Sequence, residues 1–243
     1  MIRIATAYDD LLNLYGDYAN VVALARYLRE SGFLVETCGF SSGSYIDLLS
    51  VDMLYIGSGT ERRLLAAMED FKRFYQEIQS FVKKGGFILA TGTAVALIGS
   101  SVVDFDGNIH EGPGLLDYDV TFVKKRSYRE IIATSELIAQ PVIGNVNSSM
   151  VITGRENPLF HVTDSSFGKR ITHEGAHRNT VFATELSGPL LVRNPDFLHF
   201  FAEKVSDKKI QKNDSVWVGH AHEGYSRALA KMRNSIKGSI WQR

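Results

Sequence analysis

With 243 residues, of which 44% are hydrophobic and 22% are charged, the chain can bury the core of one large α/β domain with an appendage. Its formal net charge of zero gives no whole-molecule argument for nucleic-acid binding, and no apolar run approaches the ~20 residues that span a bilayer. The single cysteine, Cys38, excludes a disulfide framework and a cysteine-based metal site, and we interpret it as a buried structural thiol. The start Met1-Ile2-Arg3-Ile4 is typical of a strand rather than of a signal peptide, which predicts a cytoplasmic protein.

Apolar segments and helical segments alternate through the first hundred residues. Strands are expected at residues 2–5, 33–37, 51–56 and 87–90. Helices are expected at 17–31, within 41–50 and at 61–84, where apolar residues recur at helical spacing. Because glycines follow the strands, this order predicts an α/β fold of three layers with a mostly parallel, flavodoxin-like central sheet. Sites in such sheets lie at the carboxyl ends of the strands.

The pattern changes between about residue 115 and residue 185. Short runs rich in Val, Ile, Thr and Phe occur at residues 120–124, 131–134, 150–153 and 181–184. Separated by turn-forming residues, these runs predict mainly antiparallel additions to the sheet. A last helix of this region is expected to start at Asn194-Pro195, because proline favours the first helical position.

We divide the chain into a domain of residues 1–206 and a basic tail of residues 207–243. The tail carries eight Lys or Arg residues against three acidic ones, so its formal charge is +5 and that of the domain is −5. A helix is expected around residues 226–236 of the tail. Three interpretations stay open for it: a solvated or loosely docked helix, a partner-binding helix, or contact with nucleic acid or an acidic membrane.

The most informative stretch is the corner after the strand at 87–90. Thr91-Gly92-Thr93 joins that strand to an apolar helical segment at 94–98. In α/β enzymes of acyl transfer, such a strand-to-helix corner exposes a nucleophile and directs N–H groups at the developing oxyanion. A Ser or Cys is expected at the apex, yet Gly92 stands there. Thr91 and Thr93 flank it, but a threonine hydroxyl is a weak nucleophile without an adjacent base.

Other motifs carry little weight. His173-Glu174-Gly175-Ala176-His177 matches the zinc-protease pattern, but no helical apolar period surrounds it, so we predict no metal site. Gly57-x-Gly59 lacks the third glycine of a dinucleotide fingerprint, and we predict no cofactor. His220-x-His222 is typical of exposed loop histidines.

Five blocks of the sequence, in order, resemble the class I glutamine amidotransferase fold in its cobyric-acid-synthase-like branch, of the type found in lipid II isoglutaminyl synthase. The blocks are residues 10–17 with Asn20; 57–62; 86–99 with 114–117; 154–157; and 184–191 with Asn194-Pro195. In active relatives a Cys at the corner attacks the glutamine side-chain amide, a His acts as general base, and a glycine loop helps form the oxyanion hole. The resemblance further implies that ammonia passes to a synthetase partner.

The matching positions in this chain lack that chemistry. The Cys position matches Gly92 and the His position matches Ser187. The glycine loop is partly kept, as Gly57-Ser58-Gly59-Thr60-Glu61, and a family Glu-Asn-His stretch reads Glu156-Asn157-Pro158. The oxyanion-loop and pocket candidates are Gly57, Ser58, Gly59, Thr91, Thr93, Glu156 and Asn157.

This resemblance predicts a catalytically inactive amidotransferase-like protein that acts as a binding or partner subunit. A ligase-like synthetase subunit is the expected partner, glutamine or a related small molecule is the expected ligand, and nucleic acid is not expected. The alternative is an active glutamine amidotransferase that uses residues not recognised here. The discriminating feature is the pair Gly92 and Ser187, because an enzyme with altered chemistry usually carries a new reactive group at the same corner.

Overall fold

The computed structural model describes residues 1–166 and 171–240, so the last three residues of the basic tail lie outside the described part. The first of its sheets has the strand order β11-β12-β4-β3-β1-β2. These strands are β1 (Ile2–Ala7), β2 (Val35–Phe40), β3 (Met53–Ile56), β4 (Phe87–Thr91), β11 (Ala176–Arg178) and β12 (Val181–Thr184). All neighbouring pairs run parallel except β11 and β12. The prediction of a mostly parallel central sheet is confirmed.

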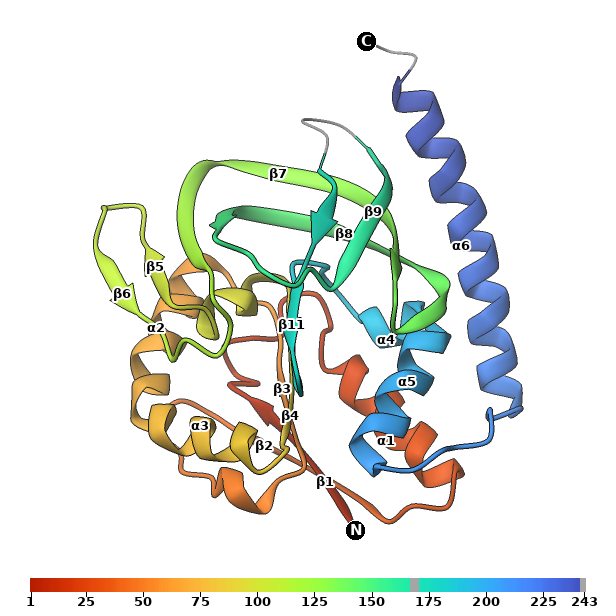
Figure 1. Ribbon diagram of the computed structural model, residues 1–243, viewed down its shortest axis with the longest axis horizontal. Coiled ribbons are helices and arrows are strands. Elements are labelled where there is room, and N and C mark those ends of the chain that lie inside the picture. Colours follow the sequence, from red (N-terminus) through yellow and green to blue (C-terminus); the bar gives the residue numbers. More distant parts are fainter. Residues whose placement is uncertain (167–170, 241–243) are drawn as a thin grey trace.

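Helices cover both faces of this sheet, which gives the expected three layers (Figure 1). The helices are α1 (Ala19–Glu30) and α5 (Pro195–Ser206) on one face, and α2 (Glu61–Phe71) and α3 (Tyr75–Lys83) on the other. Strand side chains alternate between the two cores: Leu54 packs on the α2–α3 side, while Tyr55 packs on the α1–α5 side. This alternation follows from the two-residue period of a strand.

Several expected elements differ in detail. The helix predicted for 61–84 is interrupted by a 3₁₀ turn at Lys72–Phe74. Side chains three residues apart eclipse in a 3₁₀ turn, which keeps both Phe71 and Phe74 buried against the sheet. The predicted short helix within 41–50 is a 3₁₀ turn, Leu48–Ser50. The segment after the corner is also a 3₁₀ helix, Gly92–Leu97, rather than an α-helix.

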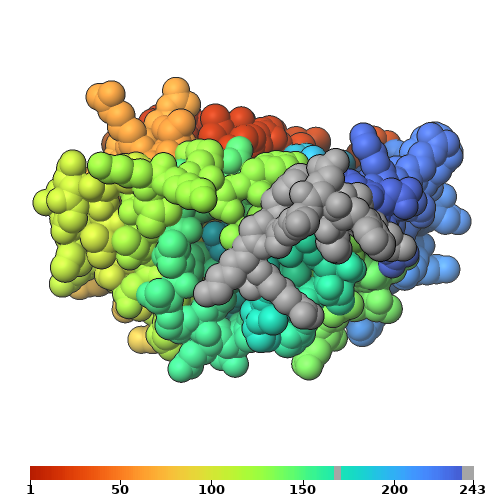
Figure 2. All heavy atoms as spheres, turned by 90° about the horizontal axis from the view of Figure 1, so that it is seen from above, coloured from red at the N-terminus to blue at the C-terminus, as the bar shows by residue number. Residues whose placement is uncertain are grey.

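A second sheet lies across the carboxyl ends of the parallel strands (Figure 1). It comprises β5 (Ser101–Val103), β6 (Ile109–Glu111), β7 (Asp119–Ser135), β8 (Ile138–Thr153), β9 (Phe160–Ser165) and β10 (His173–Glu174). We call the long antiparallel pair β7–β8 the roof. Figure 2 looks onto this side, where the yellow-green and green segments make up much of the surface. The site edge of the first sheet is therefore covered by the chain itself.

One predicted addition to the sheet is only partly antiparallel. Val181–Thr184 was expected as an antiparallel addition; β12 is antiparallel to β11 but runs parallel beside β4 in the first sheet. All four residues of β12 are buried. A strand inside a parallel sheet is buried on both faces and therefore favours a continuous apolar run such as this one.

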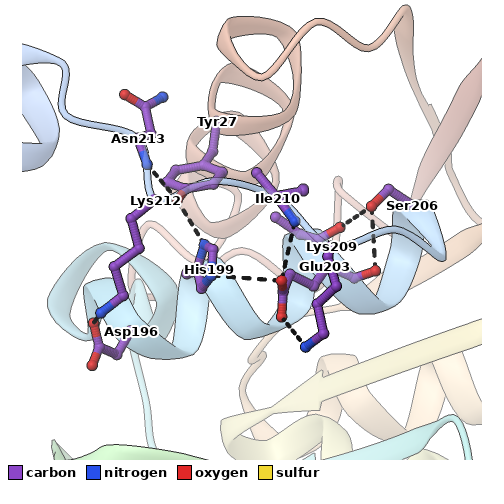
Figure 3. A network of polar contacts seen from close by, with 10 residues as sticks. Tyr27, Asp196, His199, Glu203, Ser206, Lys209, Ile210, Lys212 and Asn213 are labelled. Atoms are coloured by element: carbon purple, nitrogen blue, oxygen red, sulfur yellow. Dashed lines mark hydrogen bonds and ion pairs between the residues drawn. The ribbon is translucent and has the colours of Figure 1, made fainter.

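The basic tail is fixed to the domain at its start. Glu203 of α5 accepts hydrogen bonds from the Ile210 N–H at 3.1 Å and from Lys209 Nζ at 3.2 Å (Figure 3). The Tyr27 hydroxyl accepts a bond from the Asn213 N–H at 3.1 Å. These bonds lead the chain into a helix longer than predicted, α6 (Val216–Ile240).

Helix α6 docks on the roof. Tyr225 and Ile236 are buried against Ile132 and Ile143 of the two roof strands. The Tyr225 hydroxyl also donates to the Pro141 carbonyl at 2.8 Å. In the described residues no helix combines the length and the apolar character needed to cross a membrane.

Candidate functional site

The corner after β4 brings three separate segments to one point. Gly92 is buried and has φ +61°, a left-handed conformation that glycine adopts without strain. A Cβ placed on Gly92 would lie 1.8 Å from Ser58 Oγ, 3.0 Å from Ser58 Cβ and 3.4 Å from Ser187 Oγ. Ser58 and Ser187 are 0% and 4% exposed. The structure thus places positions 58, 92 and 187 together, with the Ser58 side chain in the space that a residue-92 side chain would need.

The N–H groups of the loop after β3 already have acceptors. The Ser58 N–H donates to Asp17 Oδ2 at 2.8 Å, and the Gly59 N–H donates to Thr93 Oγ1 at 2.9 Å. Thr93 Oγ1 in turn donates to the Gly59 carbonyl at 2.9 Å. An oxyanion hole requires donors that point at the place where the oxyanion forms. In this conformation, the two donors are used by the protein's own side chains.

Buried polar side chains hold the corner in place, and we call this cluster the Asp17 brace: Asp17, Asn20, Tyr55 and Thr91. Asp17 Oδ1 accepts the Gly188 N–H at 3.1 Å, so one carboxylate joins the loop of Ser58 to the turn of Ser187. Asn20 Nδ2 donates to the Tyr55 hydroxyl at 2.8 Å, and that hydroxyl bonds Thr91 Oγ1 at 2.7 Å. Burial raises the pKa of Asp17, against the hydrogen bonds it accepts from Ser58 and Gly188.

The roof is joined directly to the segment that contains Ser187. The Ser187 N–H donates to the Asn145 carbonyl of β8 at 2.8 Å. The Asn194 side chain accepts the Ile143 N–H at 2.8 Å and donates to the Ile143 carbonyl at 2.9 Å. These bonds satisfy part of the edge of β8 and join the roof to residues 187 and 194.

Comparison with known proteins identifies the family. The family described as the CobB/CobQ-like glutamine amidotransferase domain matches residues 3–195. The chain belongs to this family. Two relatives are each named lipid II isoglutaminyl synthase (glutamine-hydrolyzing) subunit GatD. The one from Staphylococcus aureus is 24% identical over 203 residues, covering 83% of each chain. The one from Streptococcus pneumoniae is 24% identical over 212 residues, covering 86% of this chain and 82% of its own.

A solved glutamine amidotransferase shares the fold with a TM-score of 0.50 at 12% identity, over 84% of this chain and 98% of its own. At that identity the likeness shows the fold alone. The predicted α/β amidotransferase fold is therefore confirmed by both sequence and structure.

Neither threonine of this amidotransferase corner is placed as a nucleophile. The Thr91 hydroxyl bonds Tyr55, and the Thr93 hydroxyl bonds both backbone groups of Gly59. In the described residues neither hydroxyl is hydrogen-bonded to an imidazole or a carboxylate. Cys38, expected to be buried, is only partly so, and burial raises the pKa of its thiol.

Glu156 and Asn157 lie apart from the corner. Both are exposed in the loop between β8 and β9, and the Asn157 carbonyl accepts the His177 N–H at 3.1 Å. Asn157 lines a cavity of about 470 Å³ together with Ser135, His161 and His177. The atoms nearest to a Cβ on Gly92 belong instead to Ser58 and Ser187.

The zinc-protease pattern does not form a helix, but it contains a buried acid that the sequence reading missed. Glu174 is 1% exposed, and its carboxylate accepts bonds from Thr184 Oγ1 at 2.7 Å and from the Glu185 N–H at 2.6 Å. Burial raises its pKa to about 7, with Arg155 opposing and Glu185 reinforcing the shift. Gly175, at φ +64°, separates β10 from β11 here. The only sequence signal was an acid beside a glycine in a run with no helical period.

Proposed function

We propose that this protein is a non-catalytic member of its family, of the cobyric acid synthase and lipid II isoglutaminyl synthase type, that works as a binding or partner subunit. The observation that carries the proposal is the corner itself. Gly92 supplies no nucleophile, and the nearest side chains are the hydroxyls of Ser58 and Ser187. Cleavage of a glutamine side-chain amide needs a nucleophile, a group that returns a proton to ammonia, and free donors for the oxyanion.

The proposal also covers the residual hydrolysis that a site can retain without its catalytic side chains. Removing the members of a catalytic triad leaves roughly 10³–10⁴-fold acceleration over water, which comes from the oxyanion hole and substrate binding. In this protein the Ser58 and Gly59 N–H groups bond Asp17 and Thr93. We therefore expect even that residual hydrolysis to be reduced while this conformation persists.

We further propose a ligase-like synthetase subunit as the partner, in the cytoplasm. Both relatives are named as subunits of a glutamine-hydrolysing synthase. One apolar side chain beside the corner is exposed: Leu14, whose N–H donates to the Ser58 carbonyl at 2.9 Å, is 43% exposed. A partner that covers this edge would bury it.

The experiment is release of glutamate from glutamine by the purified protein, alone and with a candidate ligase-type subunit. The glutamine-hydrolysing relative from S. aureus serves as the positive control. We expect no turnover above buffer. Turnover near the ~10 s⁻¹ typical of enzymes would overturn the non-catalytic proposal and favour the alternative, an active amidotransferase with other residues. Glutamine binding is measured separately by calorimetry, since a binding subunit can retain its ligand.

A further inference from the structure

We propose that Ser58 is the residue that closes this corner: its side chain has taken the space of the residue-92 side chain and turned a catalytic crevice into a packed structural joint. This inference rests on the proposed function in one respect, the assignment of position 92 as that of a lost nucleophile. The packing itself is independent of that assignment.

The steric argument is direct. A separation of 1.8 Å between Ser58 Oγ and a Cβ on Gly92 is far below any non-bonded contact between heavy atoms, which lie about 3.5–4.0 Å apart at their optimum. The Ser58 Cβ, at 3.0 Å, limits relief by rotation of the hydroxyl alone. As long as Ser58 keeps this position, residue 92 has to be glycine.

The backbone around Ser58 resists a retreat of the loop. Its N–H is bonded to the buried Asp17 carboxylate, and its carbonyl accepts the Leu14 N–H. The preceding glycine has no room either, because a Cβ on Gly57 would lie 2.5 Å from the Leu12 carbonyl oxygen. Moving Ser58 away from Gly92 therefore breaks hydrogen bonds of buried groups, which is costly.

It follows that positions 58 and 92 are energetically coupled. An added side chain at 92 is penalised twice, once by the left-handed backbone and once by Ser58. Substituting Ser58 by glycine removes the second penalty and leaves the first unchanged. A nucleophile that returns to this corner is therefore better tolerated when Ser58 is removed as well.

The test is a double-mutant cycle of folding stability with Gly92→Ala, Ser58→Gly and the double variant, measured by urea unfolding of the full chain. We expect Gly92→Ala to lower the folding equilibrium constant at least tenfold less in the Ser58→Gly background, a coupling of about 1.4 kcal/mol. Additive effects of the two substitutions would overturn the proposal. If Gly92→Ala alone does not fold, recovery of folding in the double variant supports it and failure to recover contradicts it.

Gly32 provides the matched control. It has φ +88°, so Gly32→Ala carries the same kind of backbone strain, but no atom lies within 4 Å of its Cβ. Its effect should add to that of Ser58→Gly without coupling. The mutant cycle measures folding stability, so its result is independent of hydrolysis. The coupling between residues 58 and 92 can be absent in a protein that does not hydrolyse glutamine, and it can be present in one that does. Failure of this inference and failure of the proposed function are therefore distinguishable.

Discussion

One carboxylate connects the two loops that meet at the corner. Asp17 is completely buried and accepts N–H groups from Ser58 on one side and Gly188 on the other. These two bonds fix the position of the Ser58 loop relative to the Ser187–Gly188 turn. Asp17 fixes the relative position of the two loops more than it adds to net folding stability, because a buried charge is costly to desolvate.

Asp17→Asn should separate the two loops. The asparagine side chain keeps one acceptor oxygen, and its NH₂ group faces a backbone N–H in place of the other. We expect a loss of about 1–3 kcal/mol in the free energy of unfolding, the cost of one buried donor left without an acceptor. Urea denaturation measures this change. Asp10→Asn, at an exposed position of the same segment, is the control and should change stability little.

The raised pKa of Glu174 predicts that the folding stability depends on pH. Its pKa rises from 4.5 to about 7 on folding because burial disfavours the charged carboxylate. The folded state therefore favours the protonated form. The stability that this protonation contributes is fully present below pH 4.5 and is lost as the pH rises through 7. Relative to wild type, Glu174→Gln should gain up to about 3 kcal/mol between about pH 5 and pH 8.5. Glu156→Gln, at an exposed site, should show no such trend; an unchanged difference for Glu174→Gln would contradict the shift.

Among the elements, those with local signals were predictable. The strands β1, β3 and β4 and the helix starting at Pro195 appear where apolar runs and a proline at the helix start indicated them. The roof was not recognised as two long strands, because Lys124, Lys125 and Arg126 interrupt the apolar pattern of β7. They lie between the pairs Phe122–Met150 and Ser127–Ser148, where the register of β7 against β8 shifts, so the regular alternation of a strand is lost there. Likewise, nothing local indicated that Ser58 would lie against Gly92.

Helix α6 should contribute to stability as part of the fold. Full burial of a side chain the size of Tyr225 or Ile236 is worth about 1.5–3 kcal/mol, so a chain ending at Asp207 should lose about 3–6 kcal/mol of unfolding free energy. Its removal would also uncover Ile132 and Ile143. Thermal and urea unfolding of this truncation measure the loss, with a chain lacking only residues 241–243 as control. Equal stability of the two chains would favour a loosely docked tail.

At the scale of the whole molecule, Asn194 connects the roof to the start of helix α5. Its amide pairs with both backbone groups of Ile143, as a neighbouring strand would, and Nδ2 also donates to the Leu190 carbonyl at 2.9 Å. Asn194 is 2% exposed, so water does not replace these bonds when the amide is absent.

Asn194→Ala should therefore weaken the joint between the roof and helix α5. Leaving the N–H of Ile143 unsatisfied in a buried site costs about 1–3 kcal/mol, and the second lost bond adds to it. Hydrogen exchange should show faster exchange of the Ile143 amide than in wild type, whereas the exposed substitution Asn234→Ala should leave it unchanged. Unaltered protection of Ile143 would show that the joint is held elsewhere.

The contact between Gly92 and Ser58 also restricts the paths by which this sequence can change. A side chain that appears first at residue 92 clashes with Ser58 and is selected against because it impairs folding. A mutation of Ser58 to glycine that comes first leaves residue 92 limited only by its left-handed backbone. The order of substitutions at residues 58 and 92 is thus constrained both when a side chain is gained at residue 92 and when one is lost. Homologues with any side chain at the position of Gly92 should consequently have a glycine or a displaced loop at the position of Ser58.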